Sequence, residues 1–588
     1  MDAQKEIFIP FIFKQCAQYN SSICIMVKGL KIRHLFHFFL LILFCLNGAA
    51  TIAQPLNKKK GFTRQDTLRG TIGPERAWWN VLKYDIQVQP DFNKKEIRGW
   101  SQITAAILKP GRRLQLDLQS PMKLDSVILL SSGASLNIEP EGNAWHIDFP
   151  QELSGGNFTI RAHYSGKPKE ARNPPWDGGW IWRKDSKGAP WMSVACQGLG
   201  ASVWYPCKDH QSDEPDQGAT LTMIVPDTLV AVGNGKLKSK SAAKKLATYT
   251  WEVTNPINIY NIVPYIGKYV SWKEAFAGEK GTLDLEYWVL DVNLEKAKQQ
   301  FQQVPKMLKC FEHWFGPYPF YKDGFKLVES PHLGMEHQSA VAYGNGYQNG
   351  YRGRDLSGSG WGLKWDFIIV HESGHEWFAN NITTNDIADM WVHEGFTAYS
   401  ETLFTTCEYG VEAGNQYVIG TRKAIQNDIP VIGIYGVNQE GSGDMYYKGS
   451  NMLHTIRQII GNDEKFRKIL RGLNSEFYHK TVDSKDVEAY ISREAGKNFS
   501  KIFDQYLRTT NVPVLEYALD KGQLTYRWTN CVKGFNMPVK ISGSGKTQII
   551  TPTPDWQTGK LSPEFAQGIA VDSNYYITTK QVDIKSIY

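Results

Sequence analysis

The chain has 588 residues, of which 42% are hydrophobic and 13% aromatic, and its formal net charge is +7. This composition indicates a globular protein of several domains and excludes a largely disordered chain. So small a net charge argues against a nucleic-acid partner.

The first 53 residues read as a secretory signal peptide. From Met26, which looks a more natural start than Met1, a basic stretch precedes an apolar run over 38–46 and small residues over 48–53. This order is typical of a cleaved leader, and the apolar run is too short to favour a membrane-spanning helix. We therefore expect an exported protein, periplasmic or secreted, with no membrane contact unless the leader is retained as an anchor.

The cysteines beyond the leader do not form a recognisable disulfide framework. They are few and odd in number: Cys196, Cys207, Cys310, Cys407 and Cys531. Their spacing leaves open whether Cys196 and Cys207 form a pair.

Periodicity divides the remaining chain into three parts. Short alternating runs such as 85–89, 114–118, 220–225 and 249–253 predict a large antiparallel β domain over residues 75–268. Residues 294–315 then carry apolar side chains at helical spacing, a short strand follows at 325–329, and helical patterns return at 452–460, 463–473 and 484–494. We expect this mixed α/β domain over residues 269–513 and a small β domain over residues 514–588.

The segment from His371 to Glu394 predicts a metal site. His371 and His375 are four residues apart, so on a helix they lie on the same face and offer two imidazoles to one ion. Glu394 begins a second helical pattern after a polar turn and can supply the third ligand. Two histidines and one glutamate leave a fourth position for water, as in catalytic zinc sites, and Glu372 is placed to act as general base.

Two further segments carry side chains suited to a peptide substrate. Glu336 follows Gly334 and Met335, and a carboxylate on an edge strand can bind a free amino terminus, although a solvated loop glutamate fits the same pattern. Tyr446 and Tyr447 are adjacent phenols, either of which can donate a hydrogen bond to an oxyanion.

Glu401 lies seven residues after Glu394 and hence on the same helical face. It can orient a ligand histidine or form a surface salt bridge, and the sequence does not decide between the two.

These motifs together resemble the aminopeptidase N family of gluzincin zinc peptidases. Similarity extends over nearly all of residues 75–515, and the four ordered motifs that carry it are Ala195-Cys196-Gln197 with 204–209, Leu333 to His337, His371 to Glu394 in Trp391-x-x-Glu394-Gly395, and Tyr446-Tyr447-Lys448-Gly449. The resemblance selects Tyr446 over Tyr447 and makes Gln197 a contact of the substrate amine. It also implies a multidomain α+β fold with an N-terminal antiparallel β saddle, a thermolysin-like α/β catalytic domain and a small C-terminal β domain.

The chain departs from the family pattern at Leu333 and His337, where glycine and asparagine are usual. Substrate preference is therefore left open.

The sequence thus predicts a zinc-dependent aminopeptidase that hydrolyses the N-terminal bond of peptides with a free N-terminus. One Zn²⁺ would be held by His371, His375 and Glu394, with Glu372 and Tyr446 as catalytic residues; the residues predicted to bind substrate are Gln197, Gly334, Met335 and Glu336. The alternatives are a thermolysin-type endopeptidase with the same metal centre and a non-catalytic binding protein on the same scaffold. The second requires lost ligands, and none is missing here.

Overall fold

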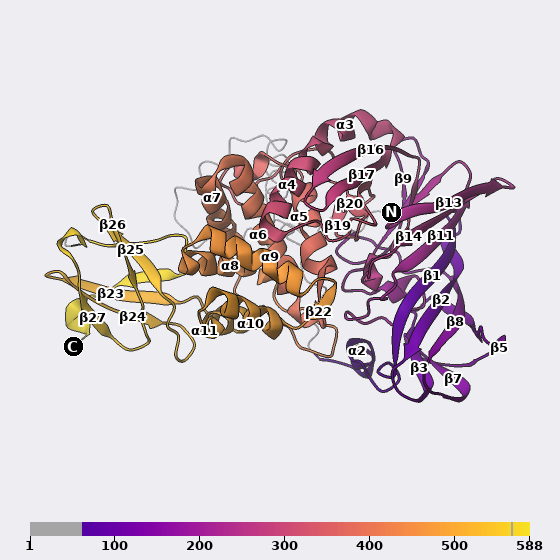
Figure 1. Ribbon diagram of the computed structural model, residues 1–588, viewed down its shortest axis with the longest axis horizontal. Coiled ribbons are helices and arrows are strands. Elements are labelled where there is room, and N and C mark those ends of the chain that lie inside the picture. Colours follow the sequence, from indigo (N-terminus) through magenta and orange to yellow (C-terminus); the bar gives the residue numbers. More distant parts are fainter. Residues whose placement is uncertain (1–60, 566–567, 588) are drawn as a thin grey trace, which may run out of the picture. The chain divides into compact units, whose positions relative to one another are not determined.

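The computed structural model describes residues 61–565 and 568–587, so the predicted signal peptide lies outside the described residues. After the short helix α2 (Arg64–Gly70), the chain begins with a part built of strands. A middle part starting at residue 269 combines a sheet with the helices, and strands return from residue 514 (Figure 1). The predicted multidomain α+β class is confirmed.

The first part is built on an eight-stranded sheet. Its strands, in spatial order, are β13 (Lys236–Ala243), β14 (Leu246–Val253), β11 (Ala219–Pro226), β1 (Trp79–Asp91), β2 (Glu96–Ile107), β8 (Asn157–Gly166), β4 (Lys123–Leu129) and β5 (Ala134–Ser135). Buried residues alternate with more accessible ones along β1 and β14, as expected for strands with one face on a core. All neighbouring pairs are antiparallel except β1 and β11, which run parallel.

Two smaller sheets complete this part. One has the order β12 (Val230–Val232), β15 (Tyr265–Gly267), β10 (Pro190–Ala195), β9 (Gly179–Lys184), and the other β3 (Gly111–Asp117), β7 (Ala144–Leu153), β6 (Asn137–Glu141). Strand β10 ends at Ala195 and therefore fixes the chain two residues before Gln197.

The middle part opens with a five-stranded sheet in the order β16 (Tyr269–Gly278), β17 (Gly281–Leu290), β18 (Phe325–Glu329), β20 (Val341–Tyr343), β19 (Gly334–Met335). Strand β19 is the edge strand and pairs antiparallel with β20. Glu336 follows β19 directly, so the sheet edge positions its carboxylate.

The helices of the middle part are α3 (Leu294–Gln300), α4 (Val304–Phe315), α5 (Phe367–Gly374), α6 (Trp391–Tyr409), α7 (Val411–Thr421), α8 (Tyr447–Ile460), α9 (Asp463–Glu476), α10 (Ser484–Ala495) and α11 (Ser500–Arg508). The single helical pattern expected over 294–315 is broken by a 3-10 turn at Phe301–Gln303. Pro305 lies in the first turn of α4, where its missing N–H is tolerated, and so favours a new helix start at this point.

The return from α5 to α6 is more elaborate than the turn expected from the sequence. Residues Glu376–Asn380 form a distorted turn in which Ala379 has φ 143°. A short strand, β21 (Ile382–Thr384), then pairs in parallel with the distant β22 (Lys480–Val482) before α6 begins. This pairing anchors the connection between the two helices that carry the predicted metal ligands.

The last part consists of two small sheets, with the orders β27 (Gln557–Lys560), β24 (Gln523–Thr529), β23 (Val514–Asp520), β29 (Thr578–Gln581) and β26 (Lys546–Ile550), β25 (Val539–Gly543), β28 (Ala570–Val571). Across the described ranges, no helix combines the length and the apolar character needed to cross a bilayer.

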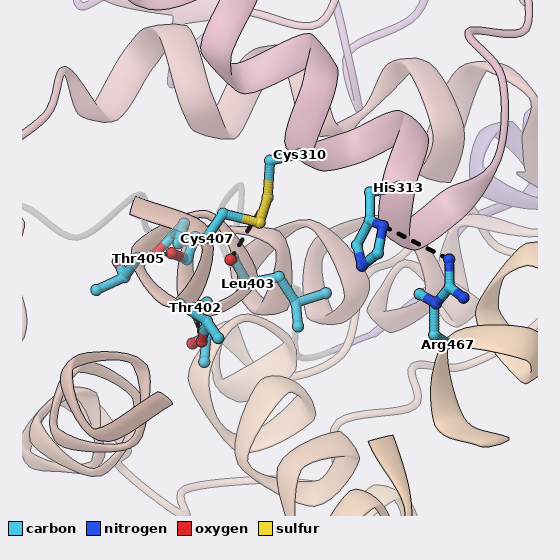
Figure 2. The surroundings of a disulfide bond; sticks show 9 residues. Cys310, His313, Thr402, Leu403, Thr405, Cys407 and Arg467 are labelled. Atoms are coloured by element: carbon cyan, nitrogen blue, oxygen red, sulfur yellow. Dashed lines mark hydrogen bonds between the residues drawn. A yellow bond between two sulfur atoms is a disulfide. The ribbon is translucent and has the colours of Figure 1, made fainter. Parts of the chain in front are cut away.

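Cys310 on α4 and Cys407 on α6 form a disulfide, which the spacing of the cysteines did not reveal (Figure 2). The two residues are 97 positions apart, and only the packing of α4 beside α6 brings their Cα atoms to 6.1 Å. Cys196 and Cys207 are buried free thiols.

Candidate zinc and peptide site

His371, His375 and Glu394 converge on one point. The side-chain carboxylate of Asp366 accepts hydrogen bonds from the first amides of α5 and so fixes the start of that helix. His371 lies in α5, His375 follows it, and Glu394 is in the first turn of α6. Oε2 of Glu394 lies 3.5 Å from Nε2 of His371 and 3.3 Å from Nε2 of His375.

Hydrogen bonds on the far side of each imidazole determine which nitrogen faces this point. Nδ1 of His371 lies 2.7 Å from a carboxylate oxygen of Glu401, and Nδ1 of His375 lies 3.0 Å from the carbonyl oxygen of Phe378. Both acceptors favour a proton on Nδ1, which leaves the Nε2 lone pairs free. Glu401 is fully buried and also accepts a hydrogen bond from Tyr417, so the surface alternative for Glu401 is wrong.

The donor set fits a single zinc ion. The three ligand atoms lie within 4.8 Å of one another, and Oε2 of Glu394 is buried without a hydrogen-bond partner. Burial opposes ionisation of Glu394, but the two histidines hold its pKa below the usual value, so the carboxylate is charged. A buried, charged oxygen facing two free imidazole nitrogens is satisfied by a cation.

Glu372 lies beside the triad formed by His371, His375 and Glu394. The position of its carboxylate depends on Gly334, which has no side chain to occupy the same space. A Cβ atom at Gly334 would lie 2.5 Å from Oε1 of Glu372 and 2.9 Å from a methyl carbon of Ile368. Burial raises the pKa of the Glu372 carboxyl to about 7, while the neighbouring histidines oppose the shift. Gly334 therefore contributes by leaving room for this carboxylate.

Glu336 is held on the same side of the site by two donors from the N-terminal part of the chain. Its Oε1 accepts hydrogen bonds from the amide of Gln197 at 2.6 Å and the hydroxyl of Tyr260 at 2.8 Å. Ligand atoms of Glu336, Glu372 and His375 lie within 4.8 Å of one another. Within the described ranges, no lysine or arginine forms an ion pair with the buried Glu336 carboxylate.

The two adjacent tyrosines point to different places. The ring of Tyr446 stacks on that of His371, with centroids 6.0 Å apart. Burial, and then the charge of Glu394, raise the pKa of Tyr446 well above its usual value, so the phenol keeps its proton. Tyr447 is buried at the start of α8; burial and then the charge of Glu401 raise its pKa well above the usual value. Tyr446 is thus the phenol that faces the triad.

Several residues of the site were not singled out from the sequence. Tyr260 contacts Glu336, Tyr417 contacts Glu401, and the amide of Asn380 donates to the carbonyl of Glu336 at 2.8 Å. None of them belongs to a local motif, so periodicity and spacing carry no signal for them.

Leu333 and His337, the two departures from the family pattern, are part of the protein interior. The Leu333 side chain packs in the apolar core, and Nδ1 of the fully buried His337 lies 2.5 Å from the hydroxyl of Tyr265. His337 thus has its contact with a strand of the N-terminal part and not with the triad.

We next compared the chain with models of known protein families. Residues 80–260 match the Peptidase M1 N-terminal domain and residues 300–506 match the Peptidase family M1 domain, which together cover more than half of the chain. The chain belongs to peptidase family M1. The resemblance inferred from the motifs is therefore confirmed.

Individual family M1 relatives are distant. Leukotriene A-4 hydrolase of Xenopus laevis is 24% identical over 71% of this chain and 68% of its own length. Aminopeptidase M1-D of Oryza sativa subsp. japonica is 21% identical over 74% of this chain and 50% of its own length. For aminopeptidase N of Lactococcus lactis subsp. lactis the values are 21%, 68% and 47%. The chain thus spans about half the length of these two aminopeptidases.

Solved structures show the same fold. An M1 zinc metallopeptidase mutant from Deinococcus radiodurans, bound to the substrate Tyr-Ser-Ala, superposes with a TM-score of 0.61 at 20% identity. The superposition covers 75% of this chain and 96% of that one.

Proposed function

We propose that this protein is a zinc-dependent aminopeptidase that removes residues one at a time from the N-terminus of peptides. The observation that carries the proposal is the buried carboxylate of Glu336, which has no lysine or arginine partner in the described chain and lies beside Glu372 and His375. An unpaired buried carboxylate is costly, and a substrate ammonium group would neutralise it. With the amine bound there, the first peptide bond is the one presented to the triad.

The chemistry assigned to this site has three parts. His371, His375 and Glu394 would hold the zinc ion, which when bound polarises the substrate carbonyl and lowers the pKa of water. Glu372 accepts the proton of the attacking water and passes it to the leaving amine. The protonated phenol of Tyr446 donates to the developing oxyanion, a contribution of roughly 3 kcal/mol.

Gln197 supports the same assignment from the N-terminal part of the chain. Its amide fixes one oxygen of Glu336 and leaves the side-chain carbonyl of Gln197 as an acceptor for the substrate amine. The peptide complex of the Deinococcus relative is consistent with substrates of this class.

The test compares leucine p-nitroanilide with its N-acetyl derivative. We expect rapid hydrolysis of the free amine only, loss of activity with a chelator, and recovery with Zn²⁺. Equal rates on the two substrates would favour the thermolysin-type endopeptidase instead. Glu372→Gln should lower kcat by a factor on the order of 100 to 10,000 while the variant still binds zinc, and full activity in this variant would exclude Glu372 as the general base.

We also propose that the protein is exported to the periplasm or beyond the cell. The leader pattern over residues 1–53 supports this, and so does the disulfide between Cys310 and Cys407, because disulfides persist in oxidising compartments. The mass of the mature chain should correspond to a start at Gln54. An intact leader on the exported chain would indicate a retained anchor.

A further inference from the structure

The carbonyl oxygen of Gly198 is held by two side chains from distant parts of the sequence. Nη2 of Arg69, in α2, donates to it at 2.8 Å, and Nδ2 of Asn438 donates at 3.0 Å. Asn438 belongs to the loop 433–442, which leads towards Tyr446. The N-terminal helix and a loop of the catalytic domain thus share one acceptor.

That acceptor lies in the turn that carries Gln197. The amide of Leu199 donates to the carbonyl of Gln197 at 2.7 Å, and the amide of Gly200 donates to the carbonyl of Cys196 at 2.7 Å. Gly198 itself has φ 68°, a left-handed conformation that favours glycine. The hydrogen bonds to the Gly198 carbonyl therefore hold the same short turn that carries Gln197.

Close packing surrounds both donors, Arg69 and Asn438. Nε of Arg69 lies 3.7 Å from Oδ2 of Asp209, and a Cβ atom at Gly200 would collide with both of these side chains. At the end of α2, a Cβ atom at Gly70 would lie 2.5 Å from the backbone nitrogen of Asn438. No side chain therefore fits between α2 and the loop at this point.

We propose that Arg69 and Asn438 are positioning residues that fix Gln197, and through it Glu336, for recognition of the substrate amine. This role rests on the proposed function of Gln197 and Glu336. It gives α2 a part in substrate binding, although Arg69 is not itself among the residues that meet the substrate.

The test measures binding directly, so it does not depend on turnover. Calorimetric titration compares leucine hydroxamate, which has a free amine, with N-acetylleucine hydroxamate. In Arg69→Met the Kd for the free amine should rise about fivefold to tenfold, the effect of losing one hydrogen bond, and the Kd for the acetylated compound should not change. Arg69→Lys should recover part of the loss, and KM for leucine p-nitroanilide should rise with kcat within about twofold.

Two comparisons separate positioning from general destabilisation. Arg64→Met, on the same helix, removes a pair with Glu141 and should leave both Kd values unchanged. In a Gln197→Ala background, Arg69→Met should add no further loss, because residues that act through one another are not additive.

Additive losses, or equal weakening of both hydroxamates, would overturn the proposal. If Arg69→Met does not fold, Asn438→Gly removes the other donor at a left-handed position and is expected to give the same selective loss. A wild-type protein that binds the free amine selectively but hydrolyses no aminoacyl substrate would contradict the proposed function and not this role of Arg69.

Discussion

At the scale of single residues, the ligand histidines are controlled by side chains that do not meet the metal position. Glu401 contacts Nδ1 of His371, and Tyr417 in turn donates to the second oxygen of Glu401 at 2.7 Å. Such contacts fix the ring orientation and the tautomer of a ligand. We therefore expect Glu401 to contribute to zinc affinity.

Replacing Glu401 by glutamine should weaken zinc binding by a factor of roughly 10 to 100, as is typical when the partner of a ligand histidine is lost. The amide keeps the size of the side chain but loses the charge that favours the Nδ1 proton. Competition with a chromogenic chelator would measure the change. Glu408→Gln is a matched control on the same helix, since Glu408 pairs with Lys306 and not with a ligand; an equal loss of affinity in both variants would contradict the assignment.

At the scale of elements, α5 is fixed at its start by a side chain that also joins it to other segments. Oδ1 of Asp366 accepts from the amides of Ile368 and Ile369, and Oδ2 accepts from the hydroxyl of Tyr343 at 2.7 Å. A cap of this kind satisfies amides that have no partner within the helix. Asp366 therefore stabilises both the helix and its contact with β20.

Asp366→Ala should destabilise the middle part of the protein by about 1 to 2 kcal/mol through loss of the cap. Asp366→Asn keeps an acceptor at the cap position and should lose less. Thermal unfolding of the two variants under the same conditions provides the comparison. An alanine variant as stable as the wild type would show that the cap is not needed once α5 is packed.

At the scale of the whole molecule, the Cys310–Cys407 disulfide ties α4 to the helix that carries Glu394 and Glu401 (Figure 2). A crosslink over 97 positions restricts the unfolded chain more than a local one does. The disulfide is therefore expected to protect the catalytic domain as a unit.

The double variant Cys310→Ser with Cys407→Ser should lose roughly 2 to 4 kcal/mol of stability, and a reductant should have the same effect on the wild type. Cys531→Ser is the control, because Cys531 is a free cysteine outside this domain. Denaturant unfolding with and without reductant measures the difference. Insensitivity of the wild type to reductant would contradict a stabilising role.

The sequence by itself determined the type of fold and predicted the three metal ligands that the structure brings together. The spacing of His371 and His375 is that of one helical turn, and alternation is a property of a single strand, so both follow from local backbone geometry. The order of the motifs also sufficed to place the chain in peptidase family M1.

Only the tertiary structure decided which distant side chains meet. Tyr260 contacts Glu336 across 76 positions, Cys310 pairs with Cys407, and Arg69 reaches the turn of Gln197, yet none of these contacts leaves a periodic signal. The family resemblance had already selected Tyr446 over Tyr447, and in the fold it is the ring of Tyr446 that stacks on His371. Such contacts depend on how separate elements pack, and packing is not encoded in the spacing of any one segment.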